Sequence, residues 1–309
     1  WDEAEGEVEG EIGSAIRSSR RKNQRKLKKW KIITFSLLFV CYVGVYVCGG
    51  CLQMASSSIQ TTLGYTADQI TNVVTFSALA RVIPKVIFGV LVDFVGGKKI
   101  LVVACIGMTI SCMALPLGTS LWWMAIAWSL VRVFGAATWP AIVKIVSKWF
   151  SSKHMGMVTS LLSLSFLFGD SVAVLYLGAL IAFGVGWQGL FFIAGVSLFV
   201  CCVIVLLILR GSPEAIGQCE ADAYAYNRLG PSGNESKPNS WQEVFIPIFT
   251  SSAFWILALY YSGLYLMREI FFTWIVAYIV SKFNVDIDIG GIALLLYNIF
   301  GAISVLEAG

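Results

Sequence analysis

The chain has 309 residues, of which 58% are hydrophobic and 13% charged, and its mean hydropathy is +0.79. A soluble domain of this length could not hide so much apolar surface in one core, so the composition excludes a water-soluble protein and predicts one that crosses a membrane several times. The net charge is only +4, so the placement of the cations carries more information than their number.

Residues 1–31 form a polar segment that is acidic at first and then basic. Nine of the 22 Lys and Arg residues lie between Arg17 and Lys31, and the segment is polar enough to be disordered. A basic run can bind nucleic acid or flank a membrane span. Because an apolar run of membrane-spanning length begins directly afterwards at Ile32, we expect a cytoplasmic flank and no nucleic-acid partner.

The rest of the chain predicts an all-α membrane protein with about eight transmembrane helices. The apolar spans are 32–54, 70–93, 99–117, 121–144, 156–184, 188–210, 250–279 and 289–309. Most loops are short, but residues 211–249 are polar and rich in Gly, Pro and Ser, which is typical of a linker. We therefore predict four parts: a tail (1–31), a six-helix bundle (32–210), a cytoplasmic linker (211–249) and the first two helices of a second bundle (250–309).

The positions of the cations predict the orientation. With the N-terminus in the cytoplasm, nearly all basic flanks lie inside and only Lys282 lies outside. Six helices, a long inner linker and further helices are typical of transporters with two six-helix halves and a central site. On that plan roughly four helices are missing after Gly309, so we expect a C-terminally truncated sequence. The distribution of the cations predicts the orientation of the chain, but it does not indicate which cellular membrane holds the protein.

The run GVLVDFVGGKK, Gly89–Lys99, lies between the second and third spans and is called the signature loop below. It resembles the signature of the major facilitator superfamily, G-x-L-x-D-[RK]-x-G-[RK]-[RK], with matches at Gly89, Leu91, Asp93, Gly96 and Lys98. Phe94 and Gly97 stand where the pattern has cations. The resemblance implies the 6+6 helical bundle of that superfamily and a gating loop in which Asp93 with Lys98 locks one conformation.

Three further stretches resemble the organophosphate:phosphate antiporter branch, which exchanges glycerol phosphate or hexose phosphates for phosphate. They are Thr138-Trp139-Pro140 followed by KWFSSKHMG, RGSPEAIG (210–217) and YLMREIFFTW (265–274). The resemblance implies that Arg268 is the phosphate-binding arginine and that Lys85 assists it. When the rest of the chain is aligned with the branch in this way, Gly50 stands where the branch has an arginine in its first helix. Phe166 stands where it has a histidine in its fifth helix.

Several charged residues fall near the middle of their spans: Arg81, Arg132, Asp170 and Arg268, with Lys85 one turn deeper. A charge inside a span is costly unless it meets a partner or a wet cavity, and an excess of cations favours an anionic ligand. We predict that Lys85, Arg268 and Arg81 contact the substrate. Arg132 and Asp170 either pair with each other or couple transport to a proton.

We therefore predict a transporter of a small organic anion, with phosphate or a phosphate ester implied by the resemblance, which works by alternating access as an antiporter. A proton-coupled carrier of a carboxylate or a neutral solute is an alternative suggested by Gly50 and Phe166. A transport-dead receptor using the basic tail and linker is another. We expect no enzyme, metal site or cofactor, a monomer in the lipid bilayer, and eight cysteines that serve as small core residues.

Overall fold

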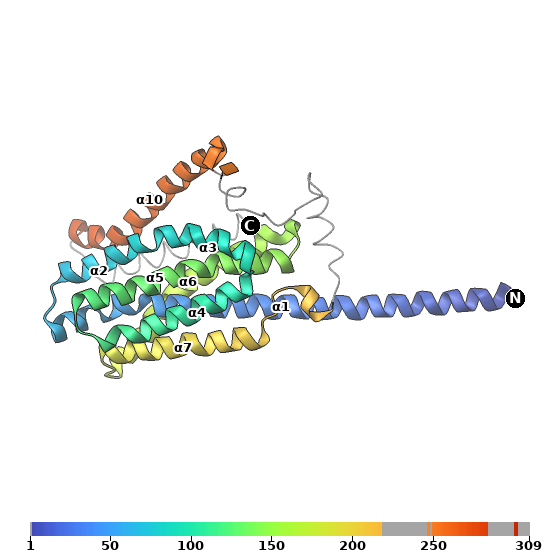
Figure 1. Ribbon diagram of the computed structural model, residues 1–309, viewed down its shortest axis with the longest axis horizontal. Helices are drawn as coiled ribbons and strands as arrows, with labels where there is room; N and C mark the ends of the chain where they lie inside the picture. The colour runs from blue at the N-terminus through green and yellow to red at the C-terminus, as the bar shows by residue number, and fades with distance from the viewer. Residues whose placement is uncertain (1, 218–245, 248, 284–299, 302–309) are drawn as a thin grey trace. The chain divides into compact units, whose positions relative to one another are not determined.

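The computed structural model describes residues 2–217, 246–247, 249–283 and 300–301 of the chain (Figure 1). The chain divides into two compact units, residues 1–227 and 228–309. The described helices of the first unit are α1 (Asp2–Leu63), α2 (Ala67–Ala80), α3 (Val82–Val95), α4 (Gly97–Ala114), α5 (Leu121–Trp149), α6 (Ser152–Ala182) and α7 (Trp187–Ile208), with 3-10 turns η1 (Leu115–Leu117) and η2 (Pro213–Ile216). The second unit contains α10 (Ser252–Phe283).

Helix α1 joins the polar segment to the first membrane span without a break. The helix begins at Asp2 and ends at Leu63, so the expectation of disorder in residues 2–31 is wrong. Glu, Lys, Arg and Gln, which dominate this segment, are all good helix formers, and the acids at its start stabilise the positive end of the helix dipole. The membrane span therefore continues out of the apolar layer as a charged helix.

The second predicted span, 70–93, is broken in two at Arg81. Helices α2 and α3 have 14 residues each and meet at this residue, whose φ and ψ of −80° and −14° are still helical. Pro84 explains the break, because it has no N–H to donate to the carbonyl of Ala80 and its ring crowds that carbonyl. The chain therefore bends here while remaining helical on both sides.

Five helices of the described residues are long and apolar enough to cross a membrane. They are Asn23–Leu63, Gly97–Leu117, Leu121–Trp149, Lys153–Ala182 and Trp187–Ile208, which match the first, third, fourth, fifth and sixth predicted spans. The seventh span corresponds to α10, in which the segment with described side chains, Ser252–Met267, is apolar. Apart from residues 300–301, the eighth span lies outside the described residues.

The first unit is a helical bundle with one continuous core. Helix α4 packs along α5 and α7, α1 packs along α6 and α7, and α2 and α3 pack on α5 (Figure 1). At its centre the rings of Trp128 and Phe191 meet edge to face with centroids 6.2 Å apart. The buried cysteines are Cys41, Cys48, Cys51, Cys105, Cys112 and Cys202. Their burial confirms that these residues are part of the core; Cys219 lies outside the described residues.

Candidate functional site

The signature loop forms the turn between α3 and α4. Gly96 has a φ of +96°, a backbone conformation that residues with a Cβ rarely adopt, which explains a glycine there. A Cβ on Gly97 would lie 2.7 Å from the carbonyl oxygen of Ala141 and 2.8 Å from Cγ1 of Ile145. The start of α4 thus approaches α5 too closely for a side chain. This contact gives a physical reason for the departure from the signature pattern at Gly97.

Asp93 holds α3 to α5 through an ion pair. Its Oδ1 lies 2.7 Å from Nζ of Lys144, and the two side chains are 45% and 34% exposed. Lys98 acts elsewhere, since its Nζ donates a hydrogen bond to the backbone carbonyl of Leu206 at the end of α7, at 3.0 Å. Asp93 and Lys98 of the signature loop therefore tie its two helices to different neighbours.

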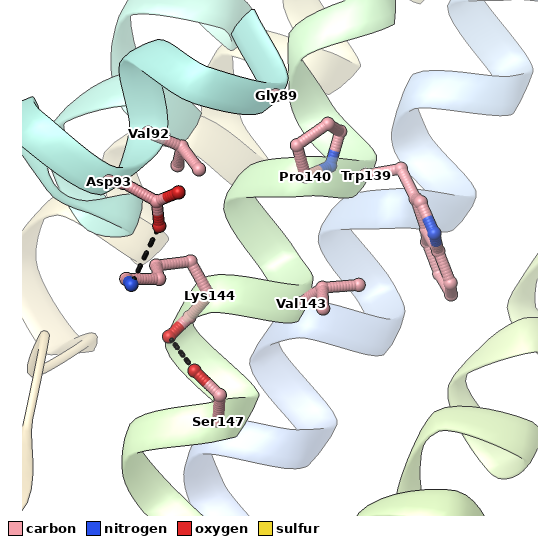
Figure 2. Close-up of a pocket in the computed structure, with 8 residues that line it drawn as sticks. All are labelled: Gly89, Val92, Asp93, Trp139, Pro140, Val143, Lys144 and Ser147. Atoms are coloured by element: carbon pink, nitrogen blue, oxygen red, sulfur yellow. Dashed lines mark hydrogen bonds and ion pairs between the residues drawn. The ribbon is translucent and has the colours of Figure 1, made fainter. Parts of the chain in front are cut away.

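The ion pair lies in an open pocket of about 330 Å³ between α3 and α5 (Figure 2). It is lined by Gly89, Val92, Asp93, Trp139, Pro140, Val143, Lys144 and Ser147. In Figure 2 the Asp93 carboxylate and the Lys144 ammonium face each other, while Ser147 donates to the Lys144 carbonyl at 2.9 Å. Because its charged groups already neutralise each other, the pocket is better suited to a conformational latch than to holding an anion.

A second group of side chains lies among α1, α5 and α6 and is called the aromatic cluster below: Tyr42, Tyr46, Trp139 and Phe166. Ring centroids are 5.3 Å apart for Tyr42 and Trp139 and 5.1 Å for Tyr46 and Phe166. The two tyrosine hydroxyls are 3.4 Å apart. The Asp170 carboxylate interacts electrostatically with Tyr42. The aromatic cluster therefore combines apolar ring faces, two hydroxyls and a nearby acid.

Arg132 lies at the middle of α5 and is half-buried. Its guanidinium carbon is 5.2 Å from the centre of the Trp128 ring, a cation–π contact, and it interacts electrostatically with Cys48 of α1. The side chain is thus held inside the bundle between α5 and α1. Pairing of Arg132 with Asp170 stays a prediction.

The three predicted substrate contacts are divided between the two units. Arg81 is half-buried at the junction of α2 and α3, and Lys85 is exposed on α3, one turn further along. Among the described side chains, neither of these makes an ion pair. Arg268 belongs to α10 in the second unit, and its side chain lies outside the described residues. A joint site of Lys85 and Arg268 stays a prediction.

The two positions at which the resembled branch has cationic or basic residues are packed here. A Cβ on Gly50 would lie 3.4 Å from Cβ of Ala173, so this position faces α6 at close range. Phe166 lies edge to face against Tyr46, and Gly169 contacts the same ring so closely that a Cβ there would lie 2.7 Å from the Tyr46 Cβ. These contacts join α1 to α6 and provide no cation.

Tyr42, Tyr46 and Lys144 are candidate functional residues that sequence reasoning missed. The two tyrosines are spaced four residues apart, which places them on one face of a helix and was a readable signal. Lys144 gave no such signal, because it is separated from Asp93 by about fifty residues of sequence.

Comparison with known proteins gives a family match and several distant relatives. The model of the Major Facilitator Superfamily matches residues 38–308. A "Probable hexose phosphate transport protein" of Chlamydia trachomatis is 22% identical over 91% of this chain and 64% of its own length. A "Probable L-galactonate transporter" of Escherichia coli is 25% identical, over 92% and 62%. The "Membrane sensor protein UhpC" of Salmonella typhimurium is 20% identical, over 92% and 64%. The chain spans less than two thirds of the length of these relatives.

Proposed function

We propose that this chain, which belongs to the major facilitator superfamily, acts in the transport of a small organic anion across a membrane by alternating access. The charge balance of the first unit carries this proposal. Near the middle of its spans it has three cations, Arg81, Lys85 and Arg132, and one acid, Asp170. Cations within membrane spans mark ion or substrate pathways, and their excess favours a negatively charged substrate.

A phosphate ester is the first candidate substrate. The chlamydial relative is named as a hexose phosphate transporter, and the motif resemblance puts Lys85 and Arg268 at phosphate-binding positions. A guanidinium group matches phosphate oxygens through two parallel hydrogen bonds, and a lysine adds a compact point charge. On this reading Arg268 binds the phosphoryl group, Lys85 and Arg81 stabilise it, and phosphate is the exchanged anion.

A hydroxylated carboxylate is the second candidate, and the packing at Gly50 and Phe166 favours it. Without charged side chains at these two positions, the site offers less positive charge than a doubly charged phosphate ester requires. The aromatic cluster provides hydroxyl groups and ring faces that suit a polyhydroxylated chain. The relative from Escherichia coli is named as a transporter of L-galactonate, a compound of this class.

Uptake by the full-length protein in proteoliposomes tests the proposal. We expect Arg268→Ala to slow anion transport roughly 30-fold or more, because truncating one side of a buried charge pair costs several kcal/mol. Lys282→Ala, an exposed cation near the end of the same helix, is the matched control and keeps the wild-type rate. Unchanged transport of every anionic substrate in Arg268→Ala would contradict the proposal.

Preloading the vesicles separates the two substrate classes. Vesicles loaded with inorganic phosphate drive counterflow of a hexose phosphate if the protein is a phosphate-ester antiporter. A carboxylate symporter gives no phosphate-driven counterflow, and its uptake of a hexonate follows an imposed proton gradient. The similarity to a membrane sensor supports a third outcome, in which no flux occurs and deletion of residues 1–30 abolishes signalling instead.

A further inference from the structure

The segment of α1 that precedes the membrane span has one face held against the bundle. Lys26 Nζ donates a hydrogen bond, 3.1 Å long, to a backbone carbonyl at the end of η2. Lys31 Nζ lies 5.6 Å from the centre of the Phe150 ring, and Leu27 and Trp30 pack on the core. These contacts fix the rotation of the helix about its axis.

The opposite face of the same segment presents three exposed cations, Arg25, Lys28 and Lys29. Their spacing of three and four residues places them side by side on one helix face. Within the described part of the chain, none of the three forms an ion pair. The same face continues with Ile32, Ser36 and Val40, of which the apolar Ile32 and Val40 are 59% and 57% exposed. The cations thus stand at the end of a mostly apolar stripe that faces away from the core.

This arrangement matches the structure of a phospholipid. With a rise of 1.5 Å per residue, the three cations lie about 5–10 Å beyond Ile32 along the axis. The headgroup layer on each side of a bilayer is about 5–8 Å thick, and the flexible stems of Lys and Arg reach further. A lipid whose acyl chain lies along Ile32 and Val40 therefore places its phosphate among the cations.

We propose that Arg25, Lys28 and Lys29 form a binding site for the headgroup of an anionic phospholipid. The exposed apolar side chains of Ile32 and Val40 on this face favour a lipid over a soluble phosphate compound, because a soluble anion would gain nothing from them. Cations near a membrane surface each add to the attraction for acidic lipids. This site is separate from the proposed transport site and does not depend on what the protein transports.

Native mass spectrometry of the full chain in detergent, titrated with defined lipids, tests the site. We expect the wild-type protein to bind phosphatidylglycerol more tightly than phosphatidylcholine. The variant Arg25→Gln/Lys28→Gln/Lys29→Gln loses about tenfold or more of its affinity for phosphatidylglycerol and none for phosphatidylcholine. Soluble glycerol phosphate does not displace the bound lipid, and displacement at equal concentration would overturn the lipid assignment.

The matched control removes the same charge from other exposed helix ends, as Lys99→Gln/Lys148→Gln/Lys153→Gln. We expect this control to keep the wild-type preference. Equal losses in both triple variants would mean a general effect of positive charge, and no loss in either would mean that the site does not exist. If the first triple variant does not fold, Lys28→Gln/Lys29→Gln decides in its place, with Lys28→Arg/Lys29→Arg expected to retain binding.

Discussion

Asp93 links the signature loop to α5, and its coupling to Lys144 can be measured. We expect a double-mutant cycle of Asp93→Asn and Lys144→Gln to give a coupling of about 0.5–1 kcal/mol in the free energy of unfolding in detergent. The value is small because both side chains are partly exposed and water screens the pair. The parallel cycle of Asp93→Asn and Lys98→Gln should give no coupling, since Lys98 bonds to the carbonyl of Leu206. Equal coupling in both cycles would contradict the structure.

The same residues show how far sequence reasoning reaches at this scale. The signature pattern identified Asp93 and Lys98 as important, because glycines, an acid and cations at that spacing are rare by chance. Their partners could not be predicted, since Lys144 and Leu206 are brought near the loop only by the packing of α5 and α7. The aromatic cluster was missed for the same reason: three helices contribute to it, and aromatic residues are common throughout the chain.

At the scale of the element, the contact between α4 and α5 depends on Gly97. Gly97→Ala brings a Cβ to within 2.7 Å of a backbone oxygen, which cannot move as a flexible side chain can. We expect a loss of about 1–3 kcal/mol in the free energy of unfolding, seen as a lower thermal midpoint in detergent.

Gly89 is the matched control for this substitution, because it is in the same loop motif and a Cβ there would have no neighbour within 4 Å. Gly89→Ala should be neutral or stabilising by about 0.5–1 kcal/mol, since alanine is the better helix former. Equal destabilisation by both substitutions would show that the close approach of α4 to α5 is not what requires glycine at position 97.

The positions of the helices were predicted well where apolar runs are long, and less well where local chemistry intervenes. Hydropathy located α4, α5, α6 and α7 because each is one uninterrupted run. The break between α2 and α3 was not predicted, although Pro84 inside a helical pattern is a known signal for a kink. In α1 the error was the opposite, because polarity was taken for disorder where strong helix formers continue the span.

At the scale of the whole molecule, composition was enough to predict an all-helical membrane protein, and the structure and the family match confirm it. The substrate site was not predictable to the same degree. It requires the relative placement of Arg268 and Lys85, which lie in separate units of the chain, and no local pattern specifies that distance.

The orientation predicted from the positions of the cations can be tested with single cysteines. The chain crosses from Lys29 to Asp68 through one membrane span, so these exposed residues lie on opposite sides. With the N-terminus inside, Asp68→Cys reacts with a membrane-impermeant maleimide in intact cells, whereas Lys29→Cys reacts only after permeabilisation.

A Cys219→Ser chain provides the blank for this labelling experiment, because six of the other cysteines are buried in the helices and Cys201 is half-buried, whereas Cys219 lies outside the described residues. Labelling of Lys29→Cys alone in intact cells would reverse the orientation and place the basic flank of α1 outside. The anionic lipid would then lie in the outer leaflet, because the cations that bind it are on the same helix face as Lys29. The orientation test therefore also shows in which leaflet of the membrane the proposed lipid site lies.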